Sequence, residues 1–194
     1  MYEASVGVFT PFLGNLSDLL DRGSAHAEAR KIDPSILLNM RLCPNMYSLK
    51  QQVSEANRHV ILASALLARR DPLELPASET DISGLKSRIK QVVEFVESLP
   101  RAEIDGAADR EVVFTFKNGN QRKFTGRSLL LTFSAPQFFF HVTTAYDILR
   151  HAGAELAKKD FSGPAPGRRG PSFRPRHHPC GRDRRPRHDR SSRA

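Results

Sequence analysis

The feature that most constrains this chain is a helical period in its apolar residues, which is repeated in four segments. The segments span residues 8–30, 48–70 and 80–99, and a fourth begins at about residue 128. In the second segment the apolar residues follow one another at steps of three or four: Leu49, Val53, Ala56, Val60, Ala63 and Leu67. Such a stripe covers one face of an α-helix and is buried against other helices. The chain is therefore predicted to form an all-α bundle of four main helices.

Residues 111–125 interrupt the helical pattern just before the last segment. The runs EVVFTF and QRKFT flank Asn118-Gly119, a pair that favours a two-residue type I′ turn. A small β-hairpin is predicted here, packed on the bundle because a lone hairpin is only marginally stable in water. Pro136 then lies inside the fourth helical pattern, where it is expected to kink or restart the helix.

The positive charge of the chain is concentrated at its end. Residues 164–194 hold ten arginines and two aspartates, which is eight of the nine net positive charges, and six of the 13 prolines. This segment has too few apolar residues to fold by burial, so a disordered Arg/Pro-rich tail is predicted after a nearly neutral domain at residues 1–163. The tail is either a nucleic-acid-binding arm or a non-native extension, and the second interpretation is preferred.

Other sequence signals exclude several classes of protein. No apolar run approaches the roughly 18 residues that a membrane span needs, and the N-terminus has no secretory pattern. Cys43 and Cys180 have no C-x-x-C partner, so neither a zinc ribbon nor a redox pair is expected. We expect a soluble, cytoplasmic protein with no membrane partner.

The stretch from Pro136 to Gly153 holds the first candidate site. With about 100° per residue, His141 lies on the apolar face of the last helix, and Tyr146 lies near the edge of that face. His26 lies on the apolar stripe of the first helix, seven residues after Leu19. Two inward-facing histidines could line a cavity and move protons near neutral pH, with His141 as base, His26 or Tyr146 as partner and no cofactor. The alternative is that each histidine is a core residue bonded to backbone groups.

Two further sets of residues could carry chemistry. Asp147 and His151 are four residues apart and are interpreted as a surface pair rather than a catalytic dyad. His26, His59 and His141 would supply three ligands from three helices to a divalent metal, as a weaker alternative to metal-free proton transfer.

Several segments resemble a known family. Ala25-His26-Ala27, the run KIDP at residues 31–34 and the run FHVTTAYDILRH at residues 140–151 are similar to an uncharacterised domain-of-unknown-function family in the DinB-like superfamily of four-helix bundles. The resemblance covers residues 1–163, and the tail has no counterpart in the family. It implies a DinB-like bundle, often a homodimer.

Many DinB-like proteins hold a divalent metal with three histidines, one from the second helix and two from the last. Here His59 would match the first, whereas His141 and His151 are ten residues apart instead of four. Three hypotheses follow: a small-molecule-binding protein with isomerase-type acid–base chemistry, a metal-dependent transferase or hydrolase, and a non-enzymatic dimeric binding module.

Overall fold

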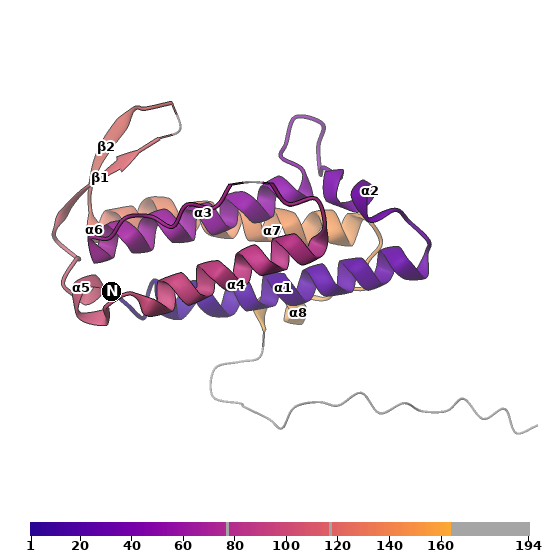
Figure 1. Ribbon diagram of the computed structural model, residues 1–194, viewed down its shortest axis with the longest axis horizontal. Helices are drawn as coiled ribbons and strands as arrows, with labels where there is room; N and C mark the ends of the chain where they lie inside the picture. Colours follow the sequence, from indigo (N-terminus) through magenta and orange to yellow (C-terminus); the bar gives the residue numbers. More distant parts are fainter. Residues whose placement is uncertain (77, 117, 164–194) are drawn as a thin grey trace, which may run out of the picture. The chain divides into compact units, whose positions relative to one another are not determined.

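Four long helices form the bundle, as the apolar period predicts. The computed structural model describes residues 1–76, 78–116 and 118–163, and the tail predicted over residues 164–194 lies outside them. The long helices are α1 (Val6–Ala29), α3 (Leu49–Ala68), α4 (Ile82–Ser98) and α7 (Ala135–His151), and they lie side by side (Figure 1). The all-α fold with one hairpin before the last helix is confirmed.

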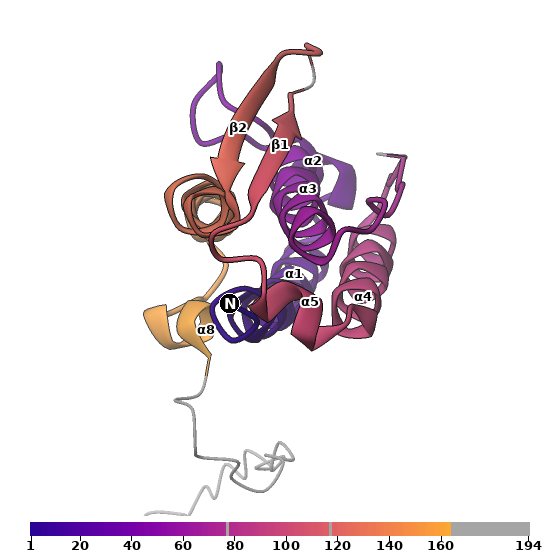
Figure 2. The ribbon, with the colours of Figure 1, turned by 90° about the vertical axis from the view of Figure 1, so that its left-hand side faces the viewer.

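Short elements connect the long helices or follow the last of them. The helical ones are α2 (Pro34–Asn39), α5 (Arg101–Asp105), α6 (Gly126–Ser128), the π-helix η1 (Leu129–Ser134) and α8 (Lys158–Ser162). The antiparallel strands β1 (Glu111–Thr115) and β2 (Gln121–Thr125) form the hairpin. Figures 1 and 2 show the hairpin over α3 and α7, on the side away from α1 and α4.

Polar side chains mark where helices begin. Asp81 precedes α4, and its carboxylate accepts hydrogen bonds from the Gly84 N–H and the Ser83 hydroxyl. Because these bonds stabilise the ionised carboxylate, they lower the pKa of Asp81, the backbone N–H having the larger effect. Asp33 caps α2 in the same way through the Ser35 N–H, and Pro34 occupies the first turn.

The hairpin turn differs from the prediction. Thr115 pairs with Gln121, and Gly119 has a φ of +82°, so the hairpin connection is longer than the expected two-residue turn. The predicted restart of the last helix at Pro136 coincides with a change of helix type, because the π-helix η1 ends at Ser134 and the α-helix α7 begins at Ala135, with Pro136 in its first turn. Pro136 has no N–H to give to the preceding turn, and the Ala135 N–H reaches back five residues to the Leu130 carbonyl.

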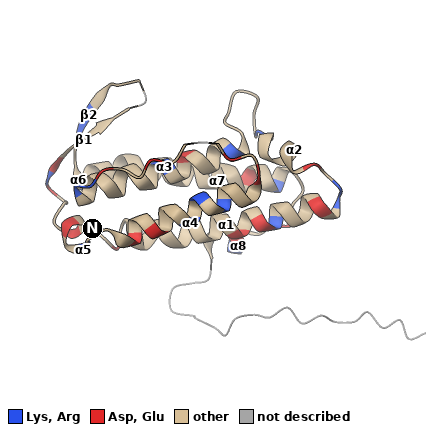
Figure 3. Ribbon diagram, in the orientation of Figure 1, with Lys and Arg blue, Asp and Glu red and all other residues tan. Residues whose placement is uncertain are grey.

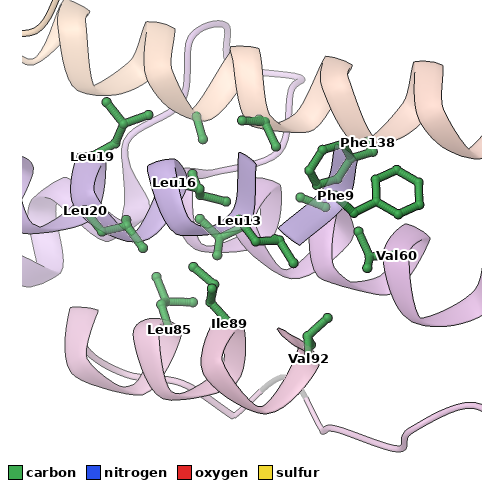
Figure 4. Close-up of a cluster of buried hydrophobic side chains, with 14 of the residues drawn as sticks. Phe9, Leu13, Leu16, Leu19, Leu20, Val60, Leu85, Ile89, Val92 and Phe138 are labelled. Carbon is green, nitrogen blue, oxygen red and sulfur yellow. The ribbon is translucent and has the colours of Figure 1, made fainter. Parts of the chain in front are cut away.

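The main core lies between the four long helices. Ten of its side chains are labelled in Figure 4: Phe9, Leu13, Leu16, Leu19, Leu20, Val60, Leu85, Ile89, Val92 and Phe138. The rings of Phe9 and Phe138 meet edge to face, with their centroids 4.9 Å apart. A second apolar cluster lies under the hairpin and contains Val112, Phe114, Phe124 and Leu129.

Charged residues occupy the outer faces of the helices. Positions of Lys and Arg and positions of Asp and Glu are interspersed along the helices (Figure 3). None of the described helices combines the length and the apolar composition that a bilayer crossing requires.

The run Phe138-Phe139-Phe140 provides a matched test of this packing. Phe138 is fully buried, whereas Phe140 is 54% exposed. Phe138→Ala is expected to lower the free energy of unfolding by about 3–5 kcal/mol, because it leaves a cavity in the core. Phe140→Ala is expected to change it by about 0.5 kcal/mol or less. Urea denaturation followed by circular dichroism measures both values, and equal losses would contradict this placement of α7.

Candidate functional site

The candidate site lies where α3 faces α7 beneath the hairpin. His59 of α3 and His141 of α7 are 5% and 6% exposed, and their rings stack with centroids 5.7 Å apart and planes 19° apart. The two helices pack against each other along their length, so both rings sit inside the bundle wall. The structure thus brings together two of the three histidines of the predicted metal set.

Glu55 completes a cluster with these histidines. It lies one helical turn before His59, on the same face of α3. The ligand atoms of Glu55, His59 and His141 all lie within 4.8 Å of one another. A carboxylate and two imidazoles at this spacing are a donor set that transition metals use in proteins.

Gln52 orients the ring of His141. Its side chain is almost fully buried, its Nε2 donates to the Tyr47 carbonyl at 3.2 Å, and its Oε1 accepts from His141 Nδ1 at 2.7 Å. The bond to Tyr47 identifies the amide nitrogen, so the oxygen faces His141. Because an amide oxygen only accepts, the proton of the neutral imidazole is on Nδ1 and the lone pair is on Nε2.

A pocket of about 400 Å³ adjoins the cluster. Its aromatic walls are Tyr47, Phe114, Phe116 and Phe133. Its polar lining consists of Glu55, Arg58, His59, Asn118 and Gln137. The volume and the mixture of apolar walls with a few polar groups are typical of small-molecule sites.

The π-helix η1 supplies one wall of the pocket. Phe133 lies in its last turn and meets the His59 ring edge on, with centroids 5.7 Å apart. The same phenylalanine packs against Phe114 at 4.9 Å and Phe116 at 5.7 Å. π-helical turns are frequent at functional sites, where they redirect a side chain.

His26 lies away from this pocket. Its Nε2 donates to the Ala152 carbonyl at 3.1 Å, beside Gly153, at the C-terminal end of α7. Ala152 is eleven residues after His141, roughly 16 Å further along the helix. The structure therefore does not bring His26 and His141 together, and it gives His26 the backbone bond of the alternative interpretation.

Tyr146 also faces elsewhere. It is five residues after His141, roughly 140° around the helix, and packs against Phe161 with ring centroids 5.9 Å apart. It lines a separate cavity of about 120 Å³, together with Asp147. Among the described residues, no hydrogen bond or ion pair joins Asp147 to the exposed His151. Cys43 is exposed and not disulfide-bonded, and Cys180 lies outside the described part of the chain.

Glu55 and Gln52 are not among the site residues predicted from the sequence, although a signal is present. No two histidines of the chain are four residues apart, but Glu55 and His59 form the equivalent pattern Glu-x-x-x-His, which places a carboxylate and an imidazole on one helix face. Gln52 falls within the apolar period of its helix, three residues after Leu49. A polar residue in an apolar stripe is buried and needs a hydrogen-bond partner.

Comparisons with known proteins agree with the fold. The model of the family described as "Domain of unknown function (DUF1993)" matches residues 1–162. The chain is similar to a DinB family member protein from Shewanella denitrificans whose crystal structure is known, with 32% sequence identity and a TM-score of 0.79. The match covers 86% of this chain and 94% of that one. No curated protein matches this chain significantly.

The role of Gln52 predicts the tautomer of His141. In chelator-treated protein, at a pH where the ring is neutral, we expect the proton on Nδ1, as detected by long-range ¹H–¹⁵N NMR. Gln52→Leu removes the acceptor, so this preference should be lost. His26 is an internal control because its bond to a carbonyl requires the proton on Nε2, in wild type and variant alike. A His141 ring protonated on Nε2 in the wild type would contradict the assignment.

Proposed function

This chain belongs to the DUF1993 family of the DinB-like superfamily, and we propose that it holds a divalent transition metal with Glu55, His59 and His141, beside a pocket for a small organic molecule. The observation that carries the proposal is the spacing of the three ligand atoms, all within 4.8 Å of one another. Relative to the ligand set expected from the sequence, Glu55 takes the place of His26.

The donor chemistry fits such an ion. Two imidazoles and one carboxylate suit Zn²⁺, Fe²⁺, Ni²⁺ and Mn²⁺ better than Ca²⁺ or Mg²⁺, which prefer all-oxygen sites. Three protein ligands leave coordination positions open, as catalytic metal sites require. Metal-binding histidines usually donate their other N–H to a fixed acceptor, and Gln52 is that acceptor for His141.

The surrounding residues support transferase or hydrolase chemistry. A bound divalent ion supplies Lewis acidity, which polarises a substrate oxygen or lowers the pKa of a bound water. Gln52 holds the His141 ring in one orientation, and Phe114 and Phe133 exclude water from the inner side of the pocket. Arg58 and Asn118 supply polar groups for a substrate.

Metal titration tests the proposal. Chelator-treated full-length protein is expected to bind Zn²⁺, and Co²⁺ with a d–d absorption spectrum, more tightly than Glu55→Gln, His59→Gln or His141→Gln does. The tail carries His177, His178 and Cys180, which bind metals weakly by themselves, so every comparison is made with that tail unchanged. His26→Gln and His151→Gln are controls and are expected to bind as the wild type does. Equal binding by the wild type and His59→Gln would contradict the proposal.

A second candidate function is metal-independent acid–base chemistry with His141 as the base. It is favoured by the Gln52 bond, which leaves the lone pair of the neutral ring on Nε2. The partner groups are then Glu55 and His59, in place of the expected His26 and Tyr146. Isomerisation of a carbonyl compound is the reaction class that this arrangement would serve.

Hydrogen–deuterium exchange separates the two functions. If the metal-independent function is correct, chelator-treated protein exchanges the protons next to the carbonyl group of ketones for deuterium. The exchange is measured by NMR on a panel of ketones. His141→Ala should abolish the exchange, and His26→Ala should retain it. Exchange that disappears on chelation and returns with Zn²⁺ would overturn the metal-independent function in favour of the first.

A further inference from the structure

The pocket beside Glu55, His59 and His141 has one strongly apolar side. Phe114 from β1, Phe116 just after it and Phe133 from η1 pack edge to face with one another, at centroid distances of 4.9 to 5.7 Å. Phe114 is buried, whereas Phe116 and Phe133 are only partly covered. Partly covered aromatic rings around a cavity are a surface on which another aromatic ring packs favourably.

The lining of the pocket also includes a cation with guanidinium N–H donors that no described residue accepts from. Arg58 of α3 lines the pocket, its side chain is 28% exposed, and its ion-pair partner Glu55 lies 3.7 Å away, too far for a hydrogen bond. Arg88 differs, because it is 5% exposed and is bonded to Glu79 and to the carbonyls of Leu75 and Pro76. Arg88 therefore anchors the segment before α4, whereas Arg58 retains guanidinium N–H donors for a ligand.

The charge of the pocket also favours an anion. In the proposed function Glu55 would be a ligand of a divalent ion, so its negative charge beside Arg58 would be neutralised and a second cation would be present near the pocket. Guanidinium groups bind carboxylates through two parallel hydrogen bonds. An apolar ring surface and a guanidinium in the lining of one pocket of about 400 Å³ match a small molecule that carries both an aromatic ring and an acid group.

We propose that this pocket binds a small aromatic carboxylate, with its ring against Phe114, Phe116 and Phe133 and its carboxylate on Arg58. The inference rests on the proposed function for the charge of the pocket, because a bound ion would neutralise Glu55 beside Arg58. The selection of ring and acid group depends only on the pocket walls, so the two ideas can be tested apart.

The test uses phenylacetate as probe, titrated into full-length protein and followed by calorimetry and by broadening of its ring-proton NMR signals. Phenethyl alcohol has the same ring without the charge, and acetate has the charge without the ring. Phenylacetate is expected to bind more tightly than either, and more tightly to zinc-loaded than to chelator-treated protein. Equal binding of acetate or of phenethyl alcohol would overturn the proposal.

Substitution of Arg58 assigns the anion contact. Arg58→Gln is expected to weaken phenylacetate binding by about tenfold to a hundredfold in chelator-treated protein, where a carboxylate cannot simply ligate the metal. Arg58→Lys should recover part of the affinity, and phenethyl alcohol should be insensitive to both changes. Arg122→Gln is the matched control, since it removes one arginine that lies over Phe124 outside the pocket. If wild type and Arg58→Gln bind phenylacetate with equal affinity, the proposal is overturned. Such a result also identifies binding to the arginine-rich tail instead of the pocket.

Zinc titration of the same variants separates the two proposals. Arg58→Gln should retain zinc affinity, because Arg58 is not a ligand, and its thermal unfolding should match that of Arg122→Gln. If zinc binds and phenylacetate does not, the ligand assignment is wrong and the metal proposal stands. If phenylacetate binds in an Arg58-dependent way to a protein that binds no zinc, the metal proposal is wrong and the ligand assignment stands.

Discussion

The packing of α3 against α7 is the constraint on which the rest of the structure depends. Most of this interface is apolar, yet Gln52, His59 and His141 are buried in it. Burying such groups is costly unless they find partners, and the 2.7 Å bond from His141 to Gln52 crosses the interface to supply one. Only one axial register of the two helices brings these side chains together. The interaction that satisfies the buried groups therefore also assembles the candidate site.

The pocket is added to the bundle by its irregular segments. Pro136 follows a π-helical turn, and that turn presents Phe133 to His59. The hairpin contributes Phe114 and Phe116 from above, and Phe133 packs against both of them. The second apolar cluster thus stabilises a hairpin that would be marginal alone, and it also forms the wall of a cavity. In the proposed function, the helical bundle supplies the metal-ligating residues, and the inserted segments supply the surface for the small molecule.

The site departs in one respect from the three-histidine arrangement that a DinB-like resemblance implies. The last helix supplies only His141 to the cluster, with the amide of Gln137 one turn before it at the pocket. The helix α3 supplies two groups, Glu55 and His59. Replacing an imidazole with a carboxylate lowers the net charge of a loaded site by one and shifts its preference towards harder divalent ions. Under the proposed function, the family fold keeps the location of a metal site while its donor set changes.

The sequence by itself determined the helices, the hairpin and the inward direction of His141, because apolar periodicity is a local property of each segment. The apolar period of one helix shows which of its faces is buried. It does not show which helix packs against that face, or how far the two helices are shifted along their axes. For that reason the sequence left open whether His26 and His141 meet, whereas the fold separates them by more than half of α7. The assembly of Glu55, His59 and His141 was decided only by tertiary structure, since it requires one register between α3 and α7. Long-range register depends on the sum of many side-chain contacts, and no single segment encodes it.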